Sequence, residues 1–330
     1  MERVKYIMKK NNYLVLLFVL LISIGAEAAE RVVVTFPQAF GLIYIMGLSD
    51  KVVGMPTQKL HIKNGKLGPF YSKYSPNLAS ATDIGFTGAV NVETVFSLQP
   101  DLVISSESLA SAKDTTKFFR DNGLKVLEIS AGFGTTKDWL DTVRKACDEA
   151  GRSEKADNYI KLWEKNLAFV SERLAKIPQD KRVKVTLINS NGGEITVRGS
   201  RSKFCIELIK LAGGKVMEGS QDPKDSAACG ELVFKFDPDI IIDDYSSTGR
   251  APEWINHLRA VKNGRVYPIP YDDKQAWITI WTFNTYSPLG ILWLAKNFYP
   301  DEFADLDLDK AHQEFCETIL GSDFQNKSAN

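Results

Sequence analysis

The sequence predicts an α/β protein in which two doubly wound α/β lobes are joined by one long linking helix, with a ligand cleft between the lobes. Three observations support this fold. A helix–strand segment occurs twice, short apolar strands alternate with helices on both sides, and a long amphipathic helix separates the halves. The 330 residues are enough for about two domains. With 44% hydrophobic and 25% charged residues, the composition is that of an ordinary globular protein.

The repeated segment comprises residues 93–104 and 231–242, which align without gaps and are identical at six of twelve positions. In each copy a short helix is expected to end before Pro100 or Pro238, because a residue that precedes proline is disfavoured in the helical conformation. The apolar runs 102–105 and 240–242 follow directly. Runs without polar alternation are typical of strands buried on both faces of a parallel sheet.

The rest of the chain alternates in the same way. In the first half, strands are predicted at 31–35, 51–54 and 125–129, and helices at 39–47, 115–122 and 136–150. In the second half, strands are predicted at 183–189, 215–217 and 265–269, and helices at 203–211 and 288–298. Gly213 and Gly214 provide the left-handed stop that commonly ends a helix. This alternation indicates parallel sheets covered by helices.

A single long helix is predicted at 153–177. Apolar residues at 156, 159, 163, 167, 170, 174 and 177 form one continuous face, and Ser153 and Pro178 suit its two ends. Its length, roughly 37 Å at 1.5 Å per residue, is enough to join two lobes along one side. The predicted organisation is therefore a signal peptide at 1–28, an N-terminal lobe at 29–152, the linking helix at 153–177 and a C-terminal lobe at 178–330.

The first 28 residues have the pattern of an export signal. Lys9 and Lys10 precede a short apolar core at 13–24, and small residues at 26 and 28 predict cleavage after Ala28. The apolar core is too short to cross a hydrocarbon layer of about 30 Å as a helix. Because no cysteine lies near the cleavage site, no lipid attachment is expected.

Export would place the four cysteines, at 147, 205, 229 and 316, in a compartment that permits disulfides. Four cysteines allow three full pairings, and the sequence does not select one. Cys205 and Cys229 lie in the same half and form the favoured pair. Buried free thiols are an equally weighted alternative.

Several functional classes have no support in the sequence. The formal net charge is zero, so nothing predicts a nucleic-acid partner. The three histidines, at 61, 257 and 312, are too scattered for a metal site built on imidazoles. No nucleophile, metalloprotease or nucleotide-binding motif occurs, so we expect no enzyme, no catalytic residue and no cofactor. A periplasmic enzyme that acts on a small molecule is kept as the alternative from a different class.

Four stretches together carry a resemblance: PQAFGLIYIMGLSDKVVG at 37–54, NVETVFSLQPDLVI at 91–104, AVKNGRVY at 260–267 and SPLGILWLAK at 287–296. In this order, around one long helix, they resemble class III periplasmic substrate-binding proteins of ABC importers, the iron–siderophore and cobalamin group. The resemblance covers the whole chain after residue 28. It implies a periplasmic protein that binds a ligand between two lobes and performs no catalysis. We further expect a monomer that is soluble after cleavage of the signal peptide.

Ligand sites in open α/β sheets form beyond the carboxyl ends of the strands, so loops in those places are expected to line the cleft. These loops are rich in aromatic residues, which provide large contact areas at a small cost in rotamer freedom. The aromatic residues predicted to contact the ligand are Phe36, Phe86, Tyr245, Tyr271 and Trp281.

Three arginines are predicted to complete the binding site. Arg198 and Arg201 precede the helix at 203–211, and Arg250 follows the strand at 240–242. A helix N-terminus favours anions, and a guanidinium group can bridge two oxygens at once. The resemblance implies that the stretch 199–201 faces the cleft. These residues suit an anionic ferric siderophore.

Other ligands stay open. Cobalamin would depend more on the aromatic residues than on arginine, and haem or a nickel or cobalt chelate is also compatible with the sequence. A tyrosine could coordinate iron directly if the chelate leaves a position open, and the candidates for this role are Tyr71, Tyr245 and Tyr271.

The remaining candidate residues concern the importer. Glu93 and Glu231 occupy the same position in the two repeats, near the expected first turn of a helix. The resemblance implies that each lobe presents one acidic residue to arginine on the inner-membrane permease. The alternative is that each carboxylate only stabilises its helix through the helix dipole, by about 0.3–1 kcal/mol.

Overall fold

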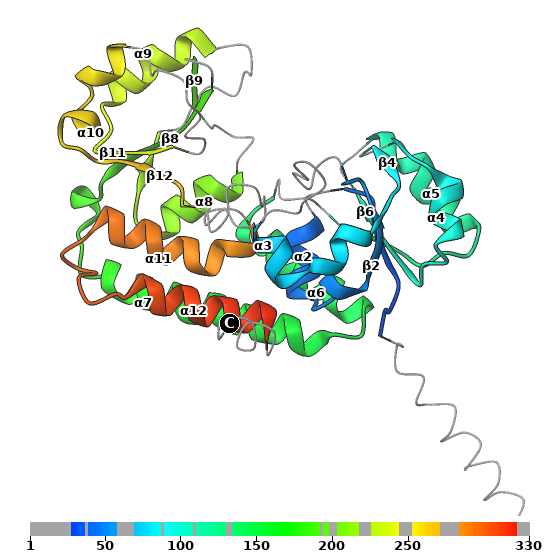
Figure 1. The fold of residues 1–330 in the computed structure, drawn as a ribbon. Helices are drawn as coiled ribbons and strands as arrows, with labels where there is room; N and C mark the ends of the chain where they lie inside the picture. Colours follow the sequence, from blue (N-terminus) through cyan, green and yellow to red (C-terminus); the bar gives the residue numbers. More distant parts are fainter. Residues whose placement is uncertain are drawn as a thin grey trace, which may run out of the picture.

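The computed structural model describes residues 28–36, 39–57, 69–86, 89–107, 110–129, 134–191, 194–197, 203–217, 226–243, 253–270 and 284–321. Within these residues the chain forms two main sheets, one from strands that precede a long helix in the sequence and one from strands that follow it (Figure 1). The predicted signal peptide at 1–28 lies almost entirely outside the described residues.

The first sheet has the order β3-β2-β1-β6-β7, and all of its neighbouring strands are parallel. Its strands are β1 (Val32–Val34), β2 (Val52–Met55), β3 (Thr82–Asp83), β6 (Leu102–Ser106) and β7 (Val126–Ile129). Around it lie α2 (Phe40–Ile45), α3 (Pro69–Tyr74), α4 (Val92–Ser97), α5 (Lys113–Asp121) and α6 (Thr136–Glu149). The short strands β4 (Gly85–Phe86) and β5 (Ala89–Val90) pair with each other in antiparallel fashion.

The second sheet has the order β10-β8-β11-β12, again parallel, and β9 is added to β8 in antiparallel fashion. Its strands are β8 (Lys184–Asn191), β9 (Glu194–Val197), β10 (Lys215–Val216), β11 (Ile240–Asp243) and β12 (Val266–Pro268). The helices of this half are α8 (Lys203–Leu211), α9 (Ser226–Phe236), α10 (Arg259–Lys262) and α11 (Ser287–Phe298). Each strand and helix predicted for both halves is present, with ends shifted by a few residues.

The predicted repeat is confirmed in detail by the backbone. Gln99 and Asp237, at equivalent positions between helix and strand, are the only described residues other than glycine with positive φ, at 47° and 45°. One residue further on, Pro100 and Pro238 are both buried. The two segments therefore leave their helices through the same left-handed turn, directly before the Pro-Asp pair that they share.

The residue that follows this proline holds each sheet together in the same way. Asp101 accepts hydrogen bonds from the backbone N–H groups of Glu30 and Arg31, at 2.8 and 3.1 Å, just before β1. Asp239 accepts one from the N–H of Lys184 at the start of β8, at 2.8 Å. Both carboxylates thus join the central strand pair of their sheet, and the prediction of two doubly wound lobes is confirmed.

The linking helix α7 spans Ser153–Leu174. Ser153 is its first helical residue and Arg152 takes the N-cap position without a side-chain hydrogen bond, so the predicted N-cap was one residue too late. The helix also ends three residues before the predicted position 177. Pro178 disfavours the helical conformation at Ile177, and Ile177 instead donates to the carbonyl oxygen of Leu174 in a final turn.

Helices α11 and α12 (Leu308–Leu320) pack along α7 (Figure 1), and α12 also contacts α2 of the first half. The sequence interpretation did not include α12. Its signals were Asp307, whose carboxylate caps the first turn, and an apolar face that includes Phe315 and Ile319. The C-terminal residues therefore extend back across the long helix to the first half of the chain.

The hydrophobic core is continuous across the two halves. One continuous buried cluster joins the two sheets through α7, α11 and α12, and contains, for example, Val32, Trp163, Ile240 and Trp293. Two smaller clusters cover the outer faces, around Val103 in the first sheet and Ile241 in the second. The two lobes therefore share one hydrophobic core, which limits how far one lobe can move without the other.

Candidate functional site

Helices of the two halves meet across the boundary between them, where α6 contacts α8 and α2 contacts the turn at Asn284–Tyr286. Helix α2 follows β1 and α6 follows β7, while α8 follows β9 and α11 comes after β12. Gly41 of α2 lies so close to Thr285 that a Cβ built on the glycine would stand 1.8 Å from the Thr285 Oγ1. Helix α2 begins beyond the carboxyl end of β1, the edge of an open α/β sheet at which ligand sites form.

A buried hydrogen-bond network fixes the same boundary. The indole N–H of Trp139 in α6 donates to the hydroxyl oxygen of Tyr159 in α7, at 3.0 Å. The Tyr159 hydroxyl in turn donates to the carbonyl oxygen of Thr285, at 2.9 Å. Burial raises the pKa of Tyr159, so the hydroxyl remains protonated and continues to donate. One side chain of the linking helix therefore ties both halves together at this point.

A second contact across the boundary involves the N-terminus of α6. The backbone N–H of Thr136 donates to the Glu207 carboxylate of α8, at 2.5 Å. Thr135 and Asp138 form a capping box on the same turn, and hydrogen bonds from Thr135 lower the pKa of Asp138. Two carboxylates and the Thr135 hydroxyl therefore accept from three N–H groups at this helix end, which makes it less favourable for an anionic ligand.

The hydroxyl groups at the ends of β1 and β6 are also used within the fold. Thr35 donates to the carbonyl oxygen of Ile104 at 3.2 Å, and Ser105 and Thr116 share a hydrogen bond of 2.7 Å. All three side chains are buried. They fasten the central strands to α5 and present no free polar group to a ligand.

Two of the residues predicted to contact ligand lie within the described residues. Phe36 follows β1 as expected but is only 1% exposed and belongs to the shared core, so it offers no accessible surface in this conformation. Phe86, in the β4–β5 hairpin, is 62% exposed. Ligand contact by either residue stays a prediction.

The other predicted ligand residues, Arg198, Arg201, Tyr245, Arg250, Tyr271 and Trp281, lie outside the described residues. Tyr71, a candidate iron ligand, is 2% exposed and packs edge-on against Phe40 and Phe70.

Of the cysteines, Cys147 is a buried free thiol, and burial raises its pKa to about 12. The side chain of Cys229 lies outside the described part, so its pairing with Cys205 stays a prediction.

Glu93 and Glu231 are both exposed, and neither forms an ion pair with another described residue. Glu93 lies in the first turn of α4, as expected, behind an Asn91 side chain that caps the helix. For Glu231 the expectation was wrong: α9 begins at Ser226, so this residue lies in the middle of the helix. The helix dipole therefore accounts for Glu93 but not for Glu231, because the dipole acts mainly within the first turn.

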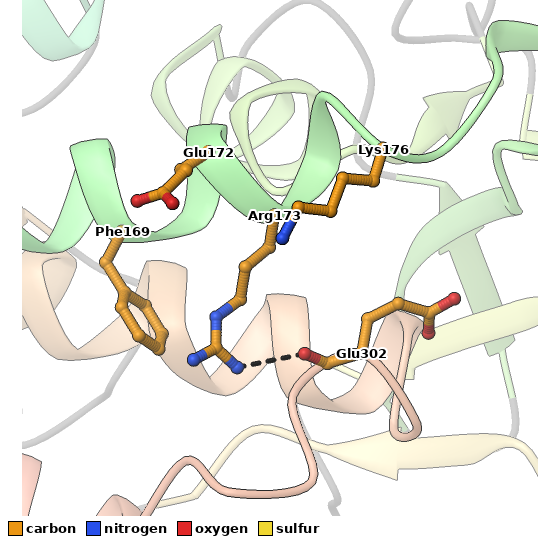
Figure 2. Close-up of a pocket in the computed structure, with 5 residues that line it drawn as sticks. All are labelled: Phe169, Glu172, Arg173, Lys176 and Glu302. Carbon is orange, nitrogen blue, oxygen red and sulfur yellow. Dashed lines mark hydrogen bonds between the residues drawn. The ribbon is translucent and has the colours of Figure 1, made fainter.

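A pocket at the far end of α7 has a structural role. Figure 2 shows Phe169, Glu172 and Arg173 of α7, Lys176 just after the helix, and Glu302. The Arg173 guanidinium lies over the Phe169 ring at 4.1 Å and donates to the carbonyl oxygen of Glu302 at 2.9 Å. A second guanidinium nitrogen donates to the Asp305 carboxylate at 2.8 Å. This arginine fastens the turn before α12 to the linking helix, away from the boundary between the halves.

The Arg173–Asp305 pair predicts a dependence of stability on pH. Hydrogen bonds from Arg173 lower the pKa of Asp305 from 3.8 to about 2 in the folded protein. A lowered folded-state pKa stabilises the fold above the unfolded value and loses this effect as the pH falls, here between about pH 4 and pH 2. We expect Asp305→Asn to lower the melting temperature at pH 6, and this difference from the wild type to shrink as the pH falls to 2.

Circular dichroism melts at pH 6, 4, 3 and 2 would measure this effect. Asp301→Asn on the same turn is the matched control, because its carboxylate pairs with no described residue. A difference between the wild type and Asp305→Asn that stays constant over this range would contradict the proposed role of the ion pair.

No group of three or more His, Cys, Asp or Glu side chains within the described residues could hold a metal ion. Among the same residues, no helix combines the length and the apolar character needed to cross a membrane.

Comparison with known proteins agrees with this architecture. A family model described as "Periplasmic binding protein" matches residues 32–272. The uncharacterized ABC transporter substrate-binding lipoprotein YvrC of Bacillus subtilis is 26% identical over 281 residues, covering 84% of this chain and 82% of that protein. The vitamin B12-binding protein of Vibrio vulnificus is 21% identical, covering 80% of this chain and 90% of its own length.

Solved structures show the same fold. The molybdate-binding protein MolA of Haemophilus influenzae, in complex with molybdate, superimposes with a TM-score of 0.67 at 21% identity. The match covers 89% of this chain and 93% of MolA. The two-sheet arrangement described above is thus the arrangement of a known binding protein over almost its whole length.

Proposed function

This chain belongs to the periplasmic binding protein family, and we propose that it is the substrate-binding component of an ABC importer. In this role it captures one small-molecule metal chelate between its two lobes and delivers the chelate to an inner-membrane permease. The observation that carries the proposal is the meeting of α2 and α6 with α8 and Thr285 across the boundary. Strands β1 and β7 lead into α2 and α6 at that boundary, so loops there can enclose one ligand.

The proposed ligand is a ferric siderophore. An anionic chelate needs positive partners, and the N-terminus of α6 is already neutralised by Asp138 and Glu207. We assign this task to Arg198, Arg201 and Arg250. The aromatic contacts are assigned to Phe86, Tyr245, Tyr271 and Trp281, and to Phe36, whose buried ring would contact the ligand only after a local rearrangement. Cobalamin, haem and a nickel or cobalt chelate remain alternatives of the same function.

We also propose where and how this protein acts. The chain is exported, loses residues 1–28 by cleavage after Ala28, and acts as a soluble periplasmic monomer. It binds and releases its ligand without changing it chemically. Glu93 and Glu231, one in each repeat, are assigned to the contact with the permease.

Titration of the protein that begins at residue 29 tests the ligand. Its six tryptophans provide an intrinsic fluorescence signal. We expect one ferric catecholate per chain to quench this signal with a dissociation constant of about 1 μM or tighter, equivalent to about −8 kcal/mol. Ferric hydroxamate, cobalamin, haem, nickel–histidine and molybdate form the comparison series, and chromatography of the bound compound checks that it is unchanged.

Each outcome of this titration has a consequence. Saturation by cobalamin, haem or the nickel chelate alone would replace the ferric chelate by that alternative. Saturation by molybdate alone would replace the chelate by an oxyanion. A flat response to the whole series would contradict the ligand assignment, and a released product would contradict the carrier function.

A further inference from the structure

The first turn of α6 belongs to the first half of the chain, yet two contacts from other parts of the molecule hold it. At Thr136, the backbone N–H donates to the Glu207 carboxylate of α8, at 2.5 Å. Three residues further on, the Trp139 indole N–H donates to the Tyr159 hydroxyl oxygen of α7, at 3.0 Å. Positions three residues apart lie on one face of a helix, so a single face of this turn is held at two points.

These contacts continue into a closed ring around the boundary between the halves. The Tyr159 hydroxyl donates to the carbonyl oxygen of Thr285, at 2.9 Å. The Thr285 side chain lies against Gly41 of α2, and α2 packs on α6. The ring therefore runs from α6 through the linking helix to the second half, and it returns to α6 through α2. Glu207 joins the second half to the same turn of α6 directly, without the linking helix.

Glu207 is the member of this set of contacts that packing does not enclose. Trp139, Tyr159 and Thr285 are at most 5% exposed. Glu207 is only partly buried, so water competes for its carboxylate. The carboxylate nevertheless lies at the positive end of α6, where the helix dipole favours a negative charge. Its contact is therefore the one that a single substitution can remove without opening a cavity in the core.

The face of α8 that carries Glu207 matches the charges on the first turn of α6. Lys203 lies four residues before Glu207 and shares its face of the helix. Hydrogen bonds from Thr135 lower the pKa of Asp138, and the positive charge of Lys203 contributes in the same direction. The carboxylate of α8 thus meets an N–H group of α6, and the ammonium group of α8 lies near a carboxylate of α6. Two opposite charges in this order favour one alignment of α8 against α6.

We propose that Glu207 is a positioning residue for ligand binding, whose hydrogen bond to the first turn of α6 sets the spacing of the two halves at the boundary. This inference rests on the proposed function. Helix α6 begins beyond β7 in the first half, and α8 begins two residues after Arg201, which is assigned to the ligand. A change in the spacing of these helices therefore displaces groups on opposite sides of the ligand, without any contact between the ligand and Glu207. A site whose spacing is fixed in advance binds more tightly, because less ordering is needed on binding.

Two other roles of Glu207 predict different results. A carboxylate that only stabilises the fold affects the melting temperature and leaves the affinity of the folded protein unchanged. A carboxylate that acts through its charge repels an anionic chelate, so its neutralisation tightens binding. Positioning depends instead on reach. Glu207→Gln keeps an acceptor oxygen at the same distance, whereas Glu207→Asp keeps the charge on a side chain that is one methylene shorter.

The first test titrates the protein that begins at residue 29 with the ferric catecholate and the other compounds of the titration series. We expect Glu207→Ala and Glu207→Asp to weaken binding of the saturating compound about tenfold, and Glu207→Gln to stay within about threefold of the wild type. Glu314→Ala is the matched control. It removes a carboxylate contact of the same length, 2.5 Å, between α12 and Lys165 of α7, and it should bind like the wild type.

Amide hydrogen exchange, followed by mass spectrometry on the protein without ligand, provides a second measurement. Loss of the Glu207 contact should speed exchange in the peptides that contain Thr136 and Thr285, because the ring joins the two places. Glu207→Gln should exchange like the wild type at both, and so should Glu314→Ala. Circular dichroism melts verify that each variant is folded at the temperature of the measurements.

Each outcome decides for or against the positioning role. Wild-type affinity of Glu207→Ala and Glu207→Asp would overturn it and leave the proposed function in place, as would tighter binding by Glu207→Gln. If the wild type binds no compound of the series, the ligand assignment fails and the exchange rates decide the inference. Unchanged rates around Thr285 in Glu207→Ala would then overturn the control of the spacing by Glu207, and faster rates would support it.

Discussion

Uptake through the importer is expected to be abolished when Glu93 and Glu231 are both replaced by alanine, while ligand binding in solution stays unchanged. Each carboxylate is exposed and pairs with no described residue, so its removal disturbs no contact within the described fold. If each charge is enclosed against a basic side chain of the permease, its loss costs about 2–5 kcal/mol. The two losses of binding free energy together would abolish a transient contact with the permease.

This prediction has a matched control. Glu154→Ala combined with Glu172→Ala removes the same number of negative charges from exposed positions of α7. That variant should support normal uptake, because α7 lies at the side of the molecule formed with α11 and α12 (Figure 1). Uptake of radiolabelled ligand by cells that carry each variant is the measurement. Normal uptake by the Glu93/Glu231 variant would reject both residues as permease contacts.

Glu231 is the more informative of the pair. At Glu93, loss of a first-turn carboxylate removes a favourable interaction with the helix dipole, worth about 0.3–1 kcal/mol, so a small loss of stability accompanies any functional effect. At Glu231, in the middle of α9, no such term applies. A defect of Glu231→Ala in uptake with an unchanged melting temperature would therefore be free of that ambiguity.

Gly41→Ala is expected to destabilise the whole protein by roughly 3 kcal/mol, which lowers the melting temperature by about 5 °C in a chain of this size. The added Cβ would stand 1.8 Å from the Oγ1 and 3.0 Å from the Cβ of Thr285. Rotation of the threonine side chain relieves only the first contact. Thr285 is also held by Tyr159, so the backbone at this point cannot retreat freely. Ligand affinity should fall as well, because α2 and Thr285 belong to opposite halves.

Two further variants make this result interpretable. Thr285→Ala in the Gly41→Ala background removes the nearest atom and should restore most of the lost stability, as expected for residues in direct contact. Gly230→Ala in α9 is the control, because its Cβ would meet only ordinary contacts at 3.5 Å or more from Trp254. That change should leave stability unchanged or raise it slightly, since alanine favours a helix interior over glycine. A Gly41→Ala protein that melts like the wild type would show that the halves do not meet there.

Much of the fold could be read from local patterns. The apolar face of α7 at 156, 159, 163, 170 and 174 is buried as predicted, because a helix of 3.6 residues per turn brings those positions to one side. The repeat around Pro100 and Pro238 also needed no tertiary information, since proline and the buried strand that follows are properties of a few adjacent residues. The end of α7 and the start of α9 were less accurate, because helix ends depend on capping contacts that a periodicity does not contain.

The candidate site was less accessible to sequence reasoning. Phe36 was placed correctly after a strand, but its burial depends on helices from both halves. Glu207 has no local signal at all, because its partner is the backbone of Thr136, 71 positions away. In the sequence, Phe118 and Phe234 look like ordinary apolar positions of amphipathic helices. Only the structure shows that their rings are exposed.

The sequence by itself determined that this protein has two related α/β halves, a long helix between them and an equivalent acidic residue in each, because repeats, periodicity and prolines act over short distances. Only the tertiary structure decided that the halves share one apolar core, that Gly41 meets Thr285, and that Glu207 reaches the first turn of α6. Those features arise from residues that are far apart in the chain and are brought together by packing, which no local pattern specifies.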